Sequence, residues 1–374
     1  MKFEDQSQVS GNGESTGRFG TAYQVLESAI EARAFPGCAF GMLAGGEVVL
    51  NDALGRFTYE PDASPVAAGT VYDIASVTKV VGTTAAAMLL VERGMLNLDT
   101  PLGEVLPGFV AKRATGDPAR RVELQHLLAH NSGLPGYLEL FRYAITPDAL
   151  LQACLALPLQ AEPGARAEYS DPGFILLGKA LETMIGESLD SFADREIFQP
   201  LGMKSTGFCP AQAARPSIPP TEEDTTFRHR RIQGEVQDEN AFVLGGVAGH
   251  AGIFSNVPDL LRFTGAILGS PRKDAGGAPV LFERTTVNRF AMRQEPAGSS
   301  CALGWDTPSQ PSSSGTQFSQ NSIGHLAYSG CSLWIDLDAA IAVVLLANRT
   351  WPDRQNQLIR EVRPAFHDAV RRAL

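Results

Sequence analysis

The stretch Asp73-Ile74-Ala75-Ser76-Val77-Thr78-Lys79 and the apolar run that follows it determine the predicted fold. Residues 80–95, VVGTTAAAMLLVERGM, are rich in Ala, Leu and Met and contain no proline, which favours a helix. Ser76 is then expected in the first turn of a largely buried helix. Lys79 follows three residues later, so both side chains lie on the same helical face.

This pair suits a nucleophile and its base. A serine hydroxyl needs a neighbouring group to take its proton, and a lysine can do so when burial lowers its pKa toward neutrality. Free N–H groups at the helix N-terminus would lie near a developing oxyanion. The Ser-x-x-Lys pattern recurs at Ser270–Lys273, but that stretch is polar and flanked by Gly and Pro, so it cannot begin a buried helix. On this context alone, Ser76 fits a structural role equally well.

Composition narrows the class of protein. The chain has 374 residues, of which 44% are hydrophobic and 19% charged, as in a soluble globular protein of one large or two interleaved domains. The net charge is −10, and the longest basic cluster is the short run around His229-Arg230-Arg231, which begins at Arg228; this argues against a nucleic-acid partner. The five cysteines are widely spaced without a Cys-x-x-Cys pair, which excludes a full disulfide framework and a cysteine-based zinc site.

The N-terminal segment and the hydropathy of the chain predict the cellular compartment of the protein. Residues 1–17 are polar and lack an apolar segment, so we expect a disordered tail and no signal peptide. No apolar run approaches the length of a membrane span. These features predict a cytoplasmic enzyme without a membrane span, and they leave the oligomeric state open.

The remaining pattern predicts an α+β fold. Residues 20–34 form an amphipathic helix, and residues 38–44 and 47–55 form a hairpin. Near the end of the chain, residues 327–336 and 340–348 are two apolar strands, and residues 353–373 form a closing helix. Residues 96–225 carry mainly helix and loop signals, including a helix with Asp171 as N-cap and Pro172 at the first helical position.

We therefore expect residues 18–374 to be a single catalytic domain. Its antiparallel sheet, flanked by terminal helices, would form one lobe from residues 18–75 and 253–374. Residues 76–252 would form a mostly helical lobe. Nucleophile sites commonly lie in the cleft between two such lobes.

Two stretches offer partners for Ser76. Tyr169 lies in a Gly-containing loop ahead of a helix, where a neighbouring ammonium would lower its pKa and let it relay protons to a leaving group. In Gly324–Gly330, the N–H of Tyr328 could face that of Ser76 as a second oxyanion donor, and His325 could bind a substrate carbonyl or carboxylate. The alternatives are a half-buried structural tyrosine and a loop histidine with satisfied hydrogen bonds.

A third, glycine-rich stretch spans residues 244–252 and contains His250. Its glycine spacing does not fit a dinucleotide fingerprint. We expect a sharply turning backbone there, and we favour a structural role for His250 over a place in the cleft.

An ordered set of motifs resembles the serine β-lactamase and penicillin-binding-protein superfamily, specifically the class C β-lactamase-like branch with family VIII carboxylesterases and DD-peptidase-like proteins. The three motifs are Ser76-Val77-Thr78-Lys79, Tyr169-Ser170-Asp171 and Gly324-His325-Leu326-Ala327. The likeness covers about residues 20–350, including 127–134, 200–203, 245–252 and 332–336. It implies Ser76 as the acylated nucleophile, Lys79 as its base partner and Tyr169 as a proton relay. It also implies the N–H groups of Ser76 and Tyr328 as the oxyanion hole, with no metal or organic cofactor.

Two departures from this pattern bear on the substrate. The second motif usually ends in Asn, whereas Asp171 can pair with Lys79 but cannot donate a hydrogen bond when ionised. The third motif is Lys-Thr-Gly in penicillin-recognising members, and His325-Leu326-Ala327 lacks its fixed positive charge and hydroxyl. These changes disfavour a carboxylate-bearing substrate more than a neutral ester.

The sequence therefore predicts a serine hydrolase that forms an acyl-enzyme, acting on small, short-chain carboxylic esters. A D-Ala-D-Ala carboxypeptidase, a D-aminopeptidase or a weak β-lactamase is the enzymatic alternative. A catalytically silent binding module with the same fold is the alternative from another class.

Overall fold

The computed structural model describes residues 17–269 and 280–374, so the N-terminal tail (residues 1–16) and the second Ser-x-x-Lys copy lie outside the described residues. Its centre is a five-stranded antiparallel sheet in the order β2-β1-β10-β9-β8. The strands are β1 Gly37–Ala44, β2 Glu47–Gly55, β8 Ser322–Leu326, β9 Ser332–Asp336 and β10 Ile341–Ala347. The predicted hairpin is confirmed, and strands from both ends of the chain share one sheet.

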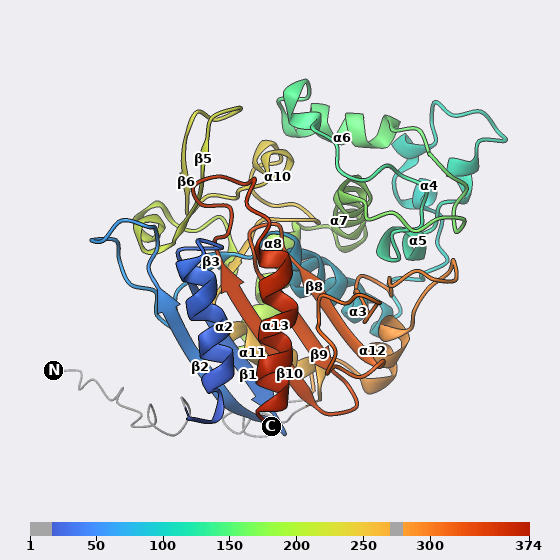
Figure 1. Cartoon of the computed structure of the whole chain (residues 1–374). Coiled ribbons are helices and arrows are strands. Elements are labelled where there is room, and N and C mark those ends of the chain that lie inside the picture. The colour runs from blue at the N-terminus through green and yellow to red at the C-terminus, as the bar shows by residue number, and fades with distance from the viewer. Residues whose placement is uncertain (1–16, 270–279) are drawn as a thin grey trace, which may run out of the picture.

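Helices cover both faces of this sheet. α2 (Gly20–Glu31) and α13 (Ile359–Arg372) cross one face side by side, as Figure 1 shows, and enclose a core with Phe40, Trp334 and Phe366. α11 (Val257–Ile267) packs against β1 and β10 from the opposite face. Because β10 is covered on both sides, all seven of its residues are buried, as its continuous apolar sequence predicts.

A mostly helical lobe lies beside the sheet, at the upper right of Figure 1. Its helices are α4 Leu102–Val105, α5 Leu124–Leu128, α6 Pro147–Ala156 and α7 Asp171–Ile185. The next helices along the chain are α8 Leu189–Ala193, labelled near the middle of Figure 1, and α9 Gln199–Leu201. The remaining elements are β3 Tyr72–Asp73, β4 Gly207–Phe208, β5 Pro220–Asp224, β6 Arg230–Gln233, α10 Glu239–Val243, β7 Ile253–Ser255 and α12 Arg284–Ala291. The α+β fold with an antiparallel sheet is confirmed.

The apolar run after Ser76 is helical but not one regular α-helix. Ala75–Val77 forms a 3₁₀ turn, Lys79–Thr84 forms π-helix, and α3 (Ala85–Glu92) continues it as α-helix. By length and composition alone, the window Ala75–Glu92 could cross a membrane, contrary to the sequence expectation, yet 83% of it is buried inside the protein. Packing in the core accounts for its apolar composition.

Two local predictions were wrong. The segment 327–336 is not one strand, because residues 327–331 form the turn between β8 and β9, and the third motif ends β8. Asp171 is not the cap of α7: the Ser170 hydroxyl accepts the Gly173 N–H at 3.0 Å and makes Ser170 the N-cap. The Asp171 carboxylate is therefore available for another partner.

Candidate active site

A cleft of about 970 Å³ brings together residues from distant parts of the chain. Ser76 reaches it from the 3₁₀ turn, Tyr169 and Asp171 from the start of α7, and His325 and Tyr328 from the end of β8 and the turn after it. The structure thus places all these predicted site residues on one cleft. Lys79 lies directly behind Ser76 and is fully buried.

A strained turn presents Ser76. The preceding residue, Ala75, has φ +41°, a conformation that costs a residue with a Cβ of order 1–3 kcal/mol. The buried Asp73 carboxylate holds this turn, because it accepts the Ala75 N–H at 2.8 Å and the Gln237 N–H at 2.7 Å. Burial raises the pKa of Asp73 to about 6, although these two N–H groups favour its ionised form.

Lys79 connects the nucleophile to the second motif. Its Nζ donates to Ser76 Oγ at 3.1 Å, to Asp171 Oδ1 at 2.7 Å and to the backbone oxygen of His250 at 3.2 Å. Three donors therefore have three acceptors, which satisfies a fully buried ammonium.

The predicted lowering of the Lys79 pKa was wrong. Burial does lower it, but the attraction of Asp171 and Tyr169 and their hydrogen bonds outweigh burial, so the pKa of Lys79 is raised. The lysine is charged in the resting site. As an ammonium it donates hydrogen bonds to the Ser76 hydroxyl and the Asp171 carboxylate, and it would stabilise any further anion in the site.

Tyr169 lies against this ammonium. Its ring centre is 4.7 Å from Lys79 Nζ, and the Lys79 ammonium and the Ser76 hydroxyl both favour the ionised form of its phenol. Desolvation nevertheless raises the pKa of Tyr169, and Lys79 offsets only part of that effect, so the predicted lowering was also wrong. At neutral pH the phenol therefore keeps its proton, and Ser76, Lys79 and Tyr169 form one coupled proton system.

The sequence did not single out His130 as a site residue. Its ring packs on that of Tyr169 with centres 4.6 Å apart, and its Nδ1 accepts the Ser170 N–H at 3.0 Å. Burial holds the pKa of His130 well below its usual range, and the charge of Lys79 lowers it too, so the ring that packs on Tyr169 is neutral. The only local signal was its place in the His-Asn-Ser-Gly turn after α5.

The two backbone N–H groups predicted to form the oxyanion hole are free to bind a substrate oxygen. Within residues 17–269 and 280–374, no acceptor takes the N–H of Ser76 or of Tyr328. Tyr328 lies in the turn after β8, and both residues line the cleft. An oxyanion between them would satisfy both donors.

His325 lies beside Tyr169, with ring centres 5.8 Å apart. Burial and, after it, the charge of the Lys79 ammonium together lower the pKa of His325 to about 3. The third motif thus contributes a neutral imidazole at physiological pH. His250 is 1% exposed, and its ring contacts Asp238 while its backbone oxygen binds Lys79, so its contacts are structural.

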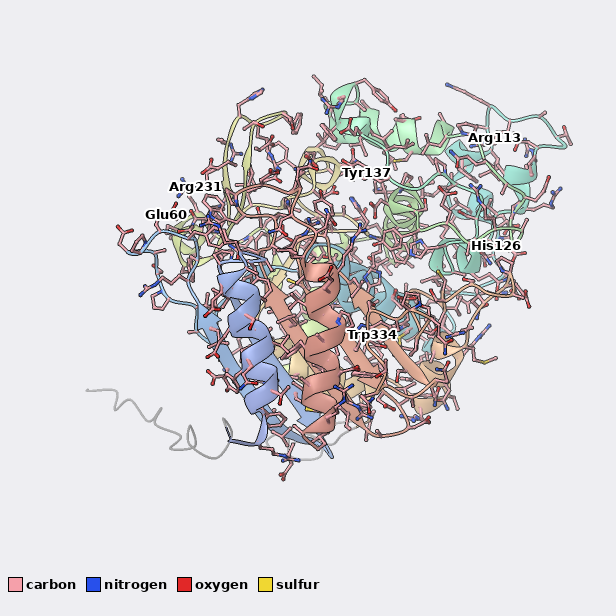
Figure 2. The ribbon with its side chains drawn as sticks, viewed as in Figure 1. Glu60, Arg113, His126, Tyr137, Arg231 and Trp334 are labelled. Atoms are coloured by element: carbon pink, nitrogen blue, oxygen red, sulfur yellow. The ribbon has the colours of Figure 1, made fainter. Side chains whose placement is uncertain are left out.

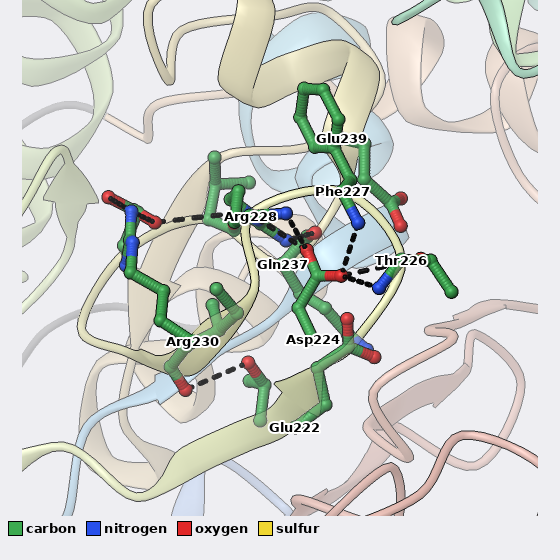
Figure 3. A network of polar contacts seen from close by, with 12 residues as sticks. Glu222, Asp224, Thr226, Phe227, Arg228, Arg230, Gln237 and Glu239 are labelled. Atoms are coloured by element: carbon green, nitrogen blue, oxygen red, sulfur yellow. Dashed lines mark hydrogen bonds and ion pairs between the residues drawn. The ribbon is translucent and has the colours of Figure 1, made fainter. Parts of the chain in front are cut away.

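A second group of buried charged residues lies beside the cleft, and two of its members, Glu239 and Arg354, line it. Figure 3 shows most of this group. Asp224 accepts from Arg228 Nε at 3.0 Å and from three backbone N–H groups, while Arg354 pairs with Glu222 and Glu239. We call these five residues the wall network. Its three carboxylates lie close enough to hold a metal ion, but each of them is already paired with a guanidinium group.

Comparisons with known proteins agree with this geometry. The Beta-lactamase family model matches residues 23–364. The chain is 30% identical to an N-acetylmuramyl-L-alanine amidase of Bacillus subtilis, over 90% of this chain and 82% of that protein. It is 30% identical to a putative D-alanyl-D-alanine carboxypeptidase of Escherichia coli K12, over 75% of this chain and 69% of that protein.

A solved structure shares the fold. EstCE1, a hydrolase with promiscuous acyltransferase activity, superimposes with a TM-score of 0.77 at 21% identity, over 96% of this chain and 99% of that one. The family match covers most of the chain, so the protein belongs to the Beta-lactamase family. It is a serine hydrolase, which removes the catalytically silent module as an alternative.

Proposed function

We propose that the protein hydrolyses small carboxylic esters through an acyl-enzyme on Ser76. Ser76 Oγ attacks the ester carbonyl in the fraction of the enzyme whose Lys79–Tyr169 pair has lost one proton, and that pair then takes the proton of the serine hydroxyl. The N–H groups of Ser76 and Tyr328 stabilise the oxyanion. When the intermediate collapses, Tyr169 returns a proton to the leaving alcohol, and water then attacks the acyl-enzyme by the same route in reverse.

The observation that carries the ester proposal is the neutral third motif. Burial holds His325 uncharged, and Leu326 adds no hydroxyl, so this strand end offers no fixed positive charge for a substrate carboxylate. A neutral ester needs only the oxyanion hole and an apolar surface, which Leu326 and Ala327 supply. This supports an ester over a penicillin or a D-alanyl peptide.

One observation supports the alternative of an amide or peptide substrate with a carboxylate. Arg360 lines the same cleft, and within the described residues its side chain has no ion-pair partner. It could replace the charge that the third motif lacks. The two relatives with 30% identity, an amidase and a putative carboxypeptidase, support the same alternative.

The two proposals separate in one kinetic comparison. We would measure kcat/KM for p-nitrophenyl butyrate and for a peptide ending in D-Ala-D-Ala, with the wild type, Ser76→Ala and Arg360→Gln. The ester proposal expects turnover of butyrate that Ser76→Ala abolishes and Arg360→Gln leaves unchanged within about twofold. Preferred turnover of the peptide, lost in Arg360→Gln, would favour the alternative instead.

A further inference from the structure

The turn at residues 327–331 is held by its carbonyl oxygens. Arg363 Nη2 donates to Ala327 O at 2.6 Å and to Cys331 O at 2.9 Å, and its Nε donates to Gly330 O at 3.2 Å. Arg363 belongs to α13, the last helix of the chain. One guanidinium from a distant element therefore holds three carbonyls of this short turn.

Arg349 holds the remaining part of the turn. Its Nε donates to Tyr328 O at 2.6 Å, and its backbone N–H donates to Ser329 O at 2.9 Å. Its Nη1 is anchored on the backbone oxygens of Arg354 and Asn356, both at 2.7 Å. All five carbonyls of residues 327–331 thus accept hydrogen bonds, while the Tyr328 N–H stays free among the described residues.

These two arginines are unusual in their charge environment. They are 4% and 6% exposed, yet within the described chain neither forms an ion pair with a carboxylate. Removing two guanidinium charges from water without a counter-ion is costly, and the hydrogen bonds to backbone carbonyls offset that cost. A positive charge behind the turn favours negative charge on its cleft side, where the Tyr328 N–H lies.

The same turn is tied to the nucleophile. Ser329 Oγ donates to the Asp73 backbone oxygen at 2.9 Å, and the Asp73 carboxylate holds the strained Ala75 turn before Ser76. A shift of the turn would change the distance between the two oxyanion donors.

We infer that Arg349 and Arg363 are positioning residues that fix the Tyr328 N–H of the oxyanion hole and supply positive charge behind it. The inference rests on the proposed function, in which this N–H binds the oxyanion. Both arginines line the cleft, but their guanidinium groups donate to the carbonyls of the turn, so we assign them a role through its peptide groups.

The test uses the full chain with Arg349→Lys, Arg363→Lys and Arg363→Met. Lysine keeps the charge but cannot hold two or three carbonyls in fixed directions. We expect kcat on p-nitrophenyl butyrate to fall about 10- to 100-fold in each, most in Arg363→Met, while KM changes less than about threefold.

A boronic acid gives a second readout that needs no physiological substrate. Ser76 Oγ adds to the trigonal boron, its proton passes to the site base, and a tetrahedral anion results with one oxygen at the oxyanion hole. We expect phenylboronic acid to bind each variant more weakly by about the factor by which kcat falls. Retained boronate affinity and unchanged kcat in all three folded variants overturn the inference, as does a wild type that binds no boronate.

Arg113, labelled at the upper right of Figure 2, provides a matched control in the helical lobe and is not among the residues that line the cleft. It also holds backbone carbonyls, donating to Phe109 O at 2.7 Å and Leu157 O at 2.6 Å. Arg113→Lys should lower thermal stability without changing kcat or boronate affinity. An equal loss of kcat in Arg113→Lys assigns the effect to folding and overturns the positioning role.

The outcomes also separate this inference from the proposed substrate. Boronate binding that weakens in the Arg349 and Arg363 variants supports the inference even if no ester is turned over. Absent ester turnover with intact wild-type boronate binding contradicts only the ester proposal.

Discussion

Two buried groups of charged residues lie near the same cleft, and they differ in whether their side chains can exchange protons. In the first, Lys79 contacts Ser76, Asp171 and Tyr169. In the second, the wall network, Arg228 and Arg354 pair with three carboxylates. In both groups every charge has a partner of opposite sign and several hydrogen bonds.

The difference lies in the basic residue. An arginine does not lose its proton in a protein, so the wall network is a static set of ion pairs. Lysine, tyrosine and serine can all exchange protons, and here they contact one another beside a half-buried hydroxyl that faces the cleft. Buried charge alone therefore does not mark the active site; a chain of exchangeable protons that reaches the cleft does.

The largest expected difference in kcat between the two groups comes from removing one hydroxyl in each, at Ser76 and at Thr226. Ser76→Ala removes the nucleophile, and we expect kcat to fall by roughly 10⁵-fold or more with stability changed by less than about 0.5 kcal/mol. Thr226→Ala removes a hydroxyl that contacts Asp224 in the wall network and should leave kcat within about twofold. Steady-state assays and urea unfolding test both; comparable loss of turnover in the two variants would erase the distinction.

Breaking the Lys79–Asp171 pair should separate catalysis from stability. Lys79→Met leaves a buried carboxylate without its partner, which costs about 3–5 kcal/mol, and we expect roughly 10³-fold lower kcat. The double variant Lys79→Met/Asp171→Leu replaces the pair by apolar side chains and should recover most of the stability but no turnover. Recovery of turnover in the double variant would show that the lysine is dispensable.

The matching change in the wall network should affect stability alone. Arg354→Met strands Glu222 and Glu239, both buried, and we expect a loss of about 3 kcal/mol in the free energy of unfolding. Because no proton is transferred there, kcat of the folded fraction should stay within about threefold. A large fall in kcat at full folding would mean that this wall takes part in catalysis.

The smallest expected effect is a shift in pH dependence. The Asp171 carboxylate raises the pKa of both Lys79 and Tyr169, so Asp171→Asn lowers both. Deprotonation of the coupled pair then occurs at lower pH, and the acidic limb of the kcat/KM profile should move down by about one pH unit. An unmoved limb in Asp171→Asn, measured beside the wild type across pH 5–10, would mean that this pair does not limit the reaction.

Local sequence was sufficient for much of the fold. The alternating and continuous apolar runs located β1, β2 and β10, and the terminal helices followed from their amphipathic patterns. The local sequence gave the wrong prediction where it fits two local structures about equally well. The turn at 327–331 interrupts an otherwise apolar strand, and Ser170 rather than Asp171 caps α7, because both residue types cap helices well.

The candidate site divides in the same way. The spacing of Ser76 and Lys79 and the order of the three motifs were evident in the sequence, together with the family resemblance that the comparisons bear out. The residue roles and the cytoplasmic location remain predictions.

The sequence by itself determined which residue types could carry the chemistry and roughly which elements present them. Only the tertiary structure decided how their protons are held. Asp171, 92 residues from Lys79 along the chain, reverses the effect of burial on the lysine pKa, and Arg363 reaches the 327–331 turn from the last helix. Electrostatic and hydrogen-bond energies depend on distance through space and on burial, and neither quantity is encoded in local sequence.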